Sequence, residues 1–253
     1  MRNRAWIVAI ATLAVLFAAS NAHELLSRFP AYRNLHRTGP FYYVESIDKI
    51  GGAVLCVLAV FLVRRAGLGD VACELGLSAP ILPAIAFALG VSLPMLIGLA
   101  LTRSLTPPLE ILPLLFLTVF SPFIEELEYR GFGVRQFQRG TGWPFWLVVW
   151  PSAILFGLGH VEKGQGLQGM ATLFFMTGFW AVLVAWLVYR WQNLWVGVAL
   201  HICMNLWWEL FSVARTAIGG WFLFALQILT MLLAVLATLY FTRTQTLAVA
   251  PTT

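Results

Sequence analysis

Apolar runs about as long as a membrane is thick recur along this chain from end to end. At about 20 apolar residues per span, the sequence predicts membrane helices near 5–22, 50–66, 80–102, 111–130, 143–160, 169–190, 193–213 and 219–241. Of the 253 residues, 60% are hydrophobic and only 11% are charged, less than half the charged fraction of a soluble domain. The pattern predicts an all-α, polytopic integral membrane bundle of about eight helices, forming a single membrane domain over 1–253.

The first apolar run has a second interpretation. Arg2 and Arg4 precede it, and "SNA" at 20–22 resembles a signal-peptidase site. A cleaved signal would leave seven spans, but we favour an anchored first helix. The segment 23–49 is predicted to be the longest loop, and 242–253 a short polar tail.

Charge and cysteine content exclude several classes of partner and site. The net charge of +5 is spread over many loops rather than gathered in one tract, so no nucleic-acid partner is expected. Cys56, Cys73 and Cys203 lie far apart without CxxC spacing, which argues against a disulfide framework and a thiolate zinc site. The expected surroundings are the lipid bilayer and a membrane-associated partner, and the oligomeric state is left open.

Four ionisable groups fall within six positions of "SPFIEELEYRGFGVRQ", residues 121–136. Each charge inside hydrocarbon costs about 2.5–3.5 kcal/mol and therefore needs a partner. Glu126 and Arg130 are four residues apart, so they share a helix face and can form an ion pair. Glu125 is rotated by about 100° from Glu126 and needs another task. Pro122 is expected to kink the helix or free a carbonyl.

Three neighbouring residues complete the expectations for this stretch. Glu128 points away from Glu125 and Glu126 and is expected at the water surface. Gly131 and Gly133 are expected to let the helix end or pack closely against a neighbour.

Two further polar clusters lie on predicted spans. "FGLGH" ends with His160, one helical turn after Phe156, and "HICMN" places His201 and Asn205 on one face at i,i+4. Each alone has a structural explanation, because a single histidine or asparagine in a membrane often serves as a helix-packing hydrogen bonder.

Taken together, the clusters supply a carboxylate, two imidazoles and a carboxamide from three helices. A carboxylate with an imidazole can deprotonate a water, and a second imidazole with a carboxamide N–H can hold a developing oxyanion. This set is sufficient to hydrolyse a peptide bond without a covalent intermediate. No GxSxG sequence occurs, and Cys203 lies off the face shared by His201 and Asn205.

The three motifs resemble those of a known family. "EELEYR" fits EExxxR, "FGLGH" fits FxxxH and "HICMN" fits HxxxN, in the order found in the CAAX protease and bacteriocin-processing family, also called CPBP or Abi. That family includes the type II CAAX prenyl endopeptidases. The similarity covers a core of about 110–210, and the remaining regions give no specific match.

The resemblance implies a glutamate-dependent, eight-helix intramembrane endopeptidase. In this sequence Glu125 and His160 would activate the attacking water, while His201 and Asn205 would form the oxyanion hole. The residues that would shape the site rather than react are Glu126, Arg130 and Phe156. The implied reaction needs no cofactor and no metal.

Three alternatives remain open. Glu125, His160 and His201 could instead bind zinc with one open position, although HExxH is absent. A non-catalytic immunity or regulatory membrane protein could use the same cavity to bind a peptide. Intramembrane carboxylates and histidines also occur in ion and proton transporters.

The expected location is the bacterial cytoplasmic (inner) membrane, as a multi-pass protein. The expected partner is a membrane-associated protein or peptide substrate. Its identity, its lipidation, the cleaved bond and the side to which the cavity opens are not encoded in the motifs.

Overall fold

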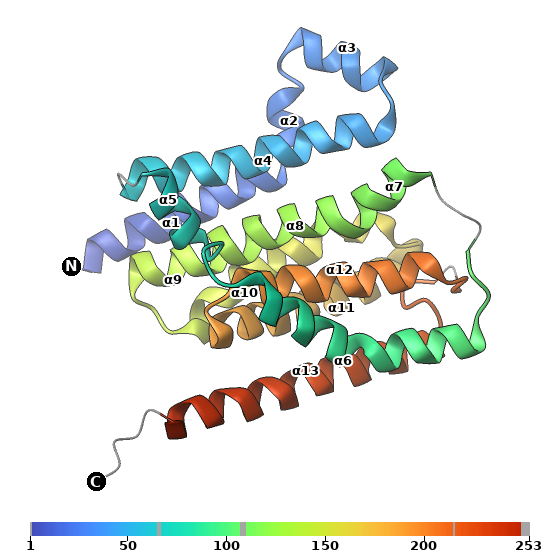
Figure 1. The fold of residues 1–253 in the computed structure, drawn as a ribbon. Coiled ribbons are helices and arrows are strands. Elements are labelled where there is room, and N and C mark those ends of the chain that lie inside the picture. Colours follow the sequence, from blue (N-terminus) through green and yellow to red (C-terminus); the bar gives the residue numbers. More distant parts are fainter. Residues whose placement is uncertain (1, 65–66, 107–109, 215, 249–253) are drawn as a thin grey trace.

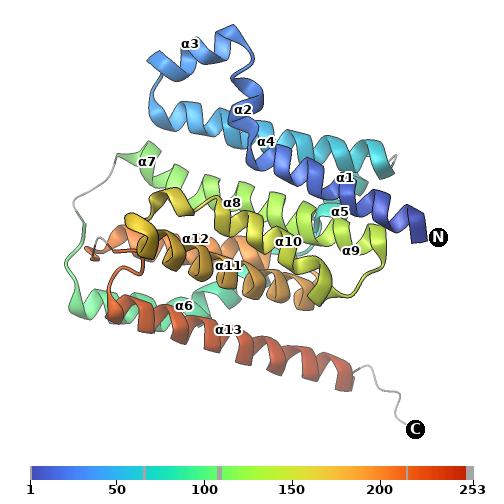
Figure 2. The ribbon, with the colours of Figure 1, turned by 180° about the vertical axis from the view of Figure 1, so that it is seen from behind.

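The fold is built from helices that lie side by side, shown from two sides in Figures 1 and 2. A computed structural model describes residues 2–64, 67–106, 110–214 and 216–248. Over these ranges no strand is present, and the only β-type contact is an isolated antiparallel bridge between Leu105 and Phe211. The predicted all-α class is confirmed.

The helical elements fall into long membrane-type helices and shorter connecting ones. In chain order they are α1 (Arg2–Ser20), α2 (Ala22–Leu26), α3 (Pro30–Thr38), α4 (Phe41–Arg64), α5 (Leu68–Leu75), α6 (Ile81–Thr102), α7 (Ile111–Leu115), η1 (Phe116–Phe120), α8 (Ser121–Glu126), η2 (Leu127–Val134), α9 (Arg135–Thr141), α10 (Phe145–Leu158), η3 (Val161–Lys163), α11 (Gly166–Trp191), α12 (Leu194–Leu210) and α13 (Trp221–Ala248).

Several of these helices can cross a membrane by length and composition. Five qualify in the described ranges, within α4, α6, α10 with its following turn, α11 and α13, and two shorter apolar helices lie at Arg4–Ser20 and Leu194–Leu210. The predicted span at 111–130 is not among the five, and it carries the cluster of charges at 125–130. Several long apolar helices fit an integral membrane protein, but the predicted number of eight is not confirmed.

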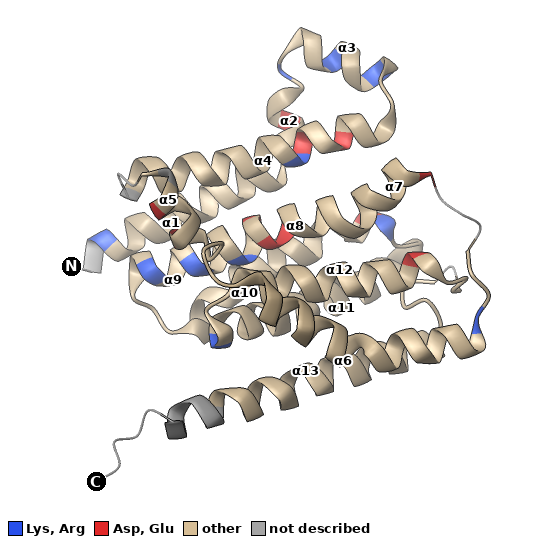
Figure 3. Ribbon diagram, in the orientation of Figure 1, with Lys and Arg blue, Asp and Glu red and all other residues tan. Residues whose placement is uncertain are grey.

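Charged side chains are distributed as a membrane protein requires. In Figure 3 most of the ribbon is neutral, charges gather toward helix ends, and an acidic group stands out on α8. This acidic group lies inside the bundle, so its charges need partners there.

The segment 23–49, predicted to be a loop, is helical, and that prediction is wrong. Pro30 begins α3, a position where proline fits because its missing N–H has no helical partner. Buried Tyr32 donates to Asp48 of α4, and His23 Nδ1 lies 2.8 Å from the same hydroxyl. Burial and the hydrogen bond to Asp48 raise the pKa of Tyr32 above its ordinary value. These contacts fold α2 and α3 back over the beginning of α4, which starts at Phe41 rather than at residue 50 (Figure 1).

The chain from 111 to 141 runs through five consecutive helical elements, two of them π-helical. At the end of η1 the backbone N–H of Ser121 donates to Phe116, five residues back. Pro122 follows and has no N–H to give. The predicted disturbance at Pro122 is therefore present as a π-turn, a local change that often accompanies an interruption of the i→i−4 hydrogen bonds of a helix.

The paired glycines on this helix allow close packing rather than ending it. A Cβ on Gly131 would lie 3.0 Å from the carbonyl oxygen of Leu75, and one on Gly133 would lie 2.9 Å from Leu16. The helix continues past both to Thr141. Small residues thus bring α5 and α1 against the helix that carries the acidic group.

Two buried clusters surround this central helix. One joins α1, α4, α5, η2, α9, α10, α11 and α12, and the other joins α6, α11, α12 and α13. α12 lies between them, because it contacts α6 on one side and α8 and η1 on the other. At the chain's end α13 continues to Ala248, so the start of the predicted tail at 242–253 is helical, while 249–253 lie outside the described residues.

We predict opposite effects of alanine at two helical glycines. A Cβ on Gly52 would lie 2.8 Å from the carbonyl oxygen of Ala19, whereas one on Gly90 would meet nothing within 4 Å. Gly52→Ala should lower the unfolding free energy by about 1–3 kcal/mol, and Gly90→Ala should leave it unchanged or raise it by up to about 1 kcal/mol. Thermal unfolding in one detergent measures both, and an equal change in the two variants would contradict the close α1–α4 packing.

Candidate functional site

The Glu126–Arg130 ion pair predicted from i,i+4 spacing is present and buried. Arg130 Nη1 lies 3.2 Å from Glu126 Oε1, and the two side chains are 1% and 0% exposed. The guanidinium also lies over the Phe156 ring, at 4.5 Å from its centroid. The ring and the carboxylate together compensate a positive charge deep in an apolar bundle.

His201 connects the two adjacent glutamates. Its Nδ1 lies 2.9 Å from Glu126 Oε1 and its Nε2 lies 4.0 Å from Glu125 Oε2. The helical rotation that keeps Glu125 away from Arg130 therefore brings both carboxyl groups to opposite sides of one imidazole from α12. The His201 ring therefore links α12 to both glutamates of α8.

Glu125 has two polar partners that sequence reasoning missed. Lys49 Nζ of α4 lies 2.9 Å from Glu125 Oε1, and the Ser121 hydroxyl donates to the same oxygen at 2.8 Å. The i,i+4 spacing of Ser121 and Glu125 was a usable signal. Lys49 gave a weaker one, a single cation at the edge of an apolar run, and its partner 76 residues away depends on the tertiary fold.

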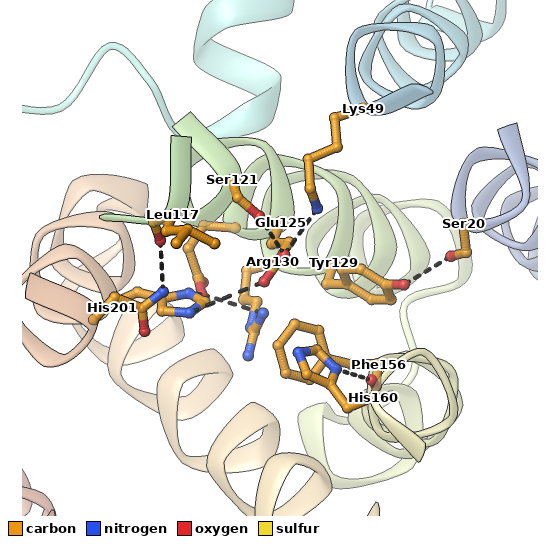
Figure 4. A network of polar contacts seen from close by, with 12 residues as sticks. Ser20, Lys49, Leu117, Ser121, Glu125, Tyr129, Arg130, Phe156, His160 and His201 are labelled. Atoms are coloured by element: carbon orange, nitrogen blue, oxygen red, sulfur yellow. Dashed lines mark hydrogen bonds and ion pairs between the residues drawn. The ribbon is translucent and has the colours of Figure 1, made fainter. Parts of the chain in front are cut away.

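His160 lies in the turn just after α10, two residues beyond the end of that helix. Its Nδ1 is 2.8 Å from the Phe156 carbonyl oxygen, and the two rings are in tilted contact, with centroids 4.6 Å apart. Since a carbonyl only accepts, Nδ1 carries the hydrogen and Nε2 is left with its lone pair. Figure 4 shows Glu125, His160 and His201 converging on one region between α8, α10 and α12.

Asn205 is fixed by the irregular backbone of the central helix. Its Nδ2 donates to the carbonyl oxygen of Leu117 in η1 at 2.9 Å. That oxygen loses its helical donors, because the N–H of Ser121 goes to Phe116 and Pro122 has none. The carboxamide satisfies a carbonyl that the π-turn frees, and one of its two amide hydrogens remains available.

Glu128 does not lie at the water surface, so that expectation is wrong. Its side chain is buried against α4 and α1, so close to Gly52 that a Cβ there would collide with the carboxylate. Oε1 has no hydrogen-bond partner, although the positive charge of Lys49 acts on it. The reason is that the helix continues through η2 into α9, which keeps Glu128 inside the bundle.

Nucleophile and metal candidates give no second site. Cys203 is buried in the α6–α12–α13 core. Over 2–64, 67–106, 110–214 and 216–248, no group of three or more His, Cys, Asp or Glu side chains has an arrangement that could hold a metal ion.

The fold and these contacts define a helical protein with several apolar helices long enough to cross a membrane and a buried polar site. Residues 106–207 match the family model described as Type II CAAX prenyl endopeptidase Rce1-like. This match over part of the chain supports the CAAX protease and bacteriocin-processing family that the three motifs indicate. Comparison with curated proteins gives no match, and comparison with solved structures gives none either.

The buried ion pair generates a test by double substitution. Arg130→Met leaves Glu126 uncompensated and should lower the unfolding free energy by about 3–5 kcal/mol. The double variant Glu126→Gln/Arg130→Met removes both charges and should be more stable than Arg130→Met alone. Thermal unfolding in detergent compares wild type, both single variants and the double variant. Strict additivity would show that the two side chains are not energetically coupled.

Proposed function

We propose that this protein is a glutamate-dependent intramembrane endopeptidase that hydrolyses a peptide bond of a membrane-associated protein or peptide. As a multi-pass protein of about eight spans, it would act in the bacterial cytoplasmic membrane. The observation that carries the proposal is the position of His201, whose Nε2 lies 4.0 Å from Glu125 Oε2, with His160 near the same region (Figure 4). Asn205 lies one helical turn after His201 on α12.

Glu125 and His160 are assigned to the attacking water. Lys49 and Ser121 both occupy Glu125 Oε1, which leaves Oε2 for a water. His160 presents Nε2, because Nδ1 is bonded to a carbonyl. A water between these two acceptors would give up its proton as it attacks the scissile carbonyl, and the same groups would return a proton to the leaving amine.

His201 and Asn205 are assigned to the developing oxyanion. His201 Nδ1 lies 2.9 Å from the Glu126 carboxylate, which fixes the ring, and the proposed role requires a hydrogen on Nε2. Asn205 has one amide hydrogen beyond the one given to Leu117. Donors fixed by Glu126 and by a backbone carbonyl need little rearrangement when charge develops, which is the source of their catalytic value.

Lys49 is proposed as a positioning residue. Its ammonium lies against Glu125 and offsets the cost of keeping that carboxylate ionised inside the bundle. It also fixes which carboxylate oxygen is bonded and which faces the water, so α4 contributes to a site whose reacting groups lie on other helices.

The proposed reaction uses no metal and no cofactor. The zinc alternative, with Glu125, His160 and His201 as ligands, predicts that chelation stops turnover and that purified active protein contains stoichiometric zinc. Activity that survives chelation, in protein without bound metal, supports the glutamate-dependent mechanism.

The first prediction for the reaction concerns the water-activating pair. Glu125→Gln and His160→Ala should each lower kcat at least about 10²-fold, while Glu162→Gln, on an exposed turn, should leave it unchanged. Comparative proteomics of intact membranes with wild type or Glu125→Gln identifies the substrate as an uncut precursor. Purified protein then provides the rates on that substrate.

Retained turnover in Glu125→Gln would contradict the mechanism. Full biological effect in both inactive variants would instead indicate a non-catalytic, peptide-binding protein.

The second prediction concerns Lys49. Lys49→Met should lower kcat at least about tenfold, because Glu125 loses the adjacent cation, and Lys49→Arg should recover most of it. Arg190→Met, which removes an exposed cation near the end of α11, is the control for a lost positive charge. Equal losses in Lys49→Met and Lys49→Arg would show that the ammonium charge does not set the activity.

A further inference from the structure

Arg130 lines a second feature besides the ion pair, a pocket between α9 and the end of α11. The pocket has a volume of about 110 Å³. Its polar lining residues are Arg130, Arg135, Gln138, Arg139, Tyr189 and Gln192. None of these residues other than Arg130 belongs to the three motifs or to the proposed reaction.

The lining residues are graded from buried to exposed. Arg130 is 2% exposed and forms the floor, and Arg135 and Gln138 are half-buried. Arg139, Tyr189 and Gln192 are exposed and form the rim. The pocket therefore leads from the surface of the bundle to a buried guanidinium.

The buried Arg130 guanidinium has N–H donors that no acceptor satisfies. Arg130 Nη1 and Nη2 are buried without a hydrogen-bond partner of acceptable geometry, although Nη1 is ion-paired with Glu126. That carboxylate is shared with His201. Unsatisfied N–H donors of a buried arginine carry a substantial penalty, which an acceptor at the pocket floor would remove.

Positive charge exceeds negative charge around the pocket. Arg139 is ion-paired with Glu74, whereas Arg135 donates mainly to the backbone carbonyls of Glu74 and Cys73. Burial, followed by the charge of Arg139, lowers the pKa of Arg135. Three guanidinium groups thus share two carboxylates, and one of these carboxylates is also held by His201.

The pocket lies at the end of a membrane-type helix, where the headgroup of a lipid could reach it. It lies where α11 ends at Trp191, and aromatic residues at the ends of spans mark the membrane–water boundary. Basic pockets between membrane helices at this depth are a known means of recognising anionic headgroups.

We propose that this pocket binds a phosphate group, with Arg130 at its floor and Arg135 and Arg139 on its walls. Guanidinium groups match phosphate oxygens with paired N–H donors, and the neutral amides and hydroxyl of Gln138, Gln192 and Tyr189 supply further donors. The group is either the phosphate of an anionic lipid or inorganic phosphate. The proposal does not depend on the endopeptidase reaction, because binding is measured directly.

The test titrates the purified full-length protein in a neutral detergent. Three ligands are compared: short-chain phosphatidylglycerol, short-chain phosphatidylcholine and inorganic phosphate. Thermal unfolding reports binding, because a ligand that binds only the folded state raises Tm with its concentration. We expect a saturable rise with phosphatidylglycerol that exceeds the rise with phosphatidylcholine. A comparable saturable rise with inorganic phosphate would identify free phosphate as a sufficient ligand.

Variants assign the effect to the pocket. Gln138→Glu places a negative charge on its wall and should weaken binding at least about tenfold. Arg139→Gln should weaken it in the same direction, and serves if Gln138→Glu does not fold. Arg190→Gln is the matched control, because Arg190 is an exposed arginine at the same end of α11 that lies outside the lining. Equal stabilisation by the two lipids without a saturable rise with inorganic phosphate, no stabilisation by any ligand, or unchanged binding in Gln138→Glu and Arg139→Gln would overturn the proposal.

Discussion

The buried Glu126–Arg130 pair is the interaction on which the rest of the site depends. Both side chains are almost completely removed from solvent, where an unpaired charge would be very costly. Their pairing is extended by the Phe156 ring on one side and the His201 imidazole on the other. Because each partner comes from a different part of the bundle, the requirement for charge compensation draws η2, α10 and α12 toward one point. The polar groups for the proposed chemistry assemble around a structural ion pair that does not itself react.

Helical geometry gives two neighbouring glutamates different surroundings, which suits the different roles proposed for them. Glu126 points toward Arg130, while Glu125, one position earlier, points toward Lys49 of α4. The Glu126 carboxylate is buried and paired through Oε1, while its Oε2 has no hydrogen-bond partner. Glu125 keeps Oε2 at 4.0 Å from His201. This division explains why an adjacent pair of acids is useful here: the first can meet a reactant because the second satisfies the arginine.

The sequence was sufficient for features that depend on local spacing and composition. The all-α class, the Glu126–Arg130 pair and the ring contact of Phe156 with His160 follow from i,i+4 periodicity and apolar run length. The contacts that it missed are long-range. Lys49 meets Glu125, and Tyr32 folds the predicted loop onto Asp48, only because distant segments pack together. Glu128 was misplaced for the same reason, since a carboxylate read as surface-facing is covered by α1 and α4.

The π-helical segment η1 has a consequence for how the site could change. A π-turn holds one more residue than an α-turn, so losing a single residue there would restore a regular helix and rotate everything before it by about 100° relative to everything after it. Such a shortening would turn the carbonyl of Leu117 away from Asn205 while leaving all three motifs intact. A relative with perfect motifs but one residue fewer between 116 and 120 would therefore hold its carboxamide differently, and motif matching alone would not reveal the difference.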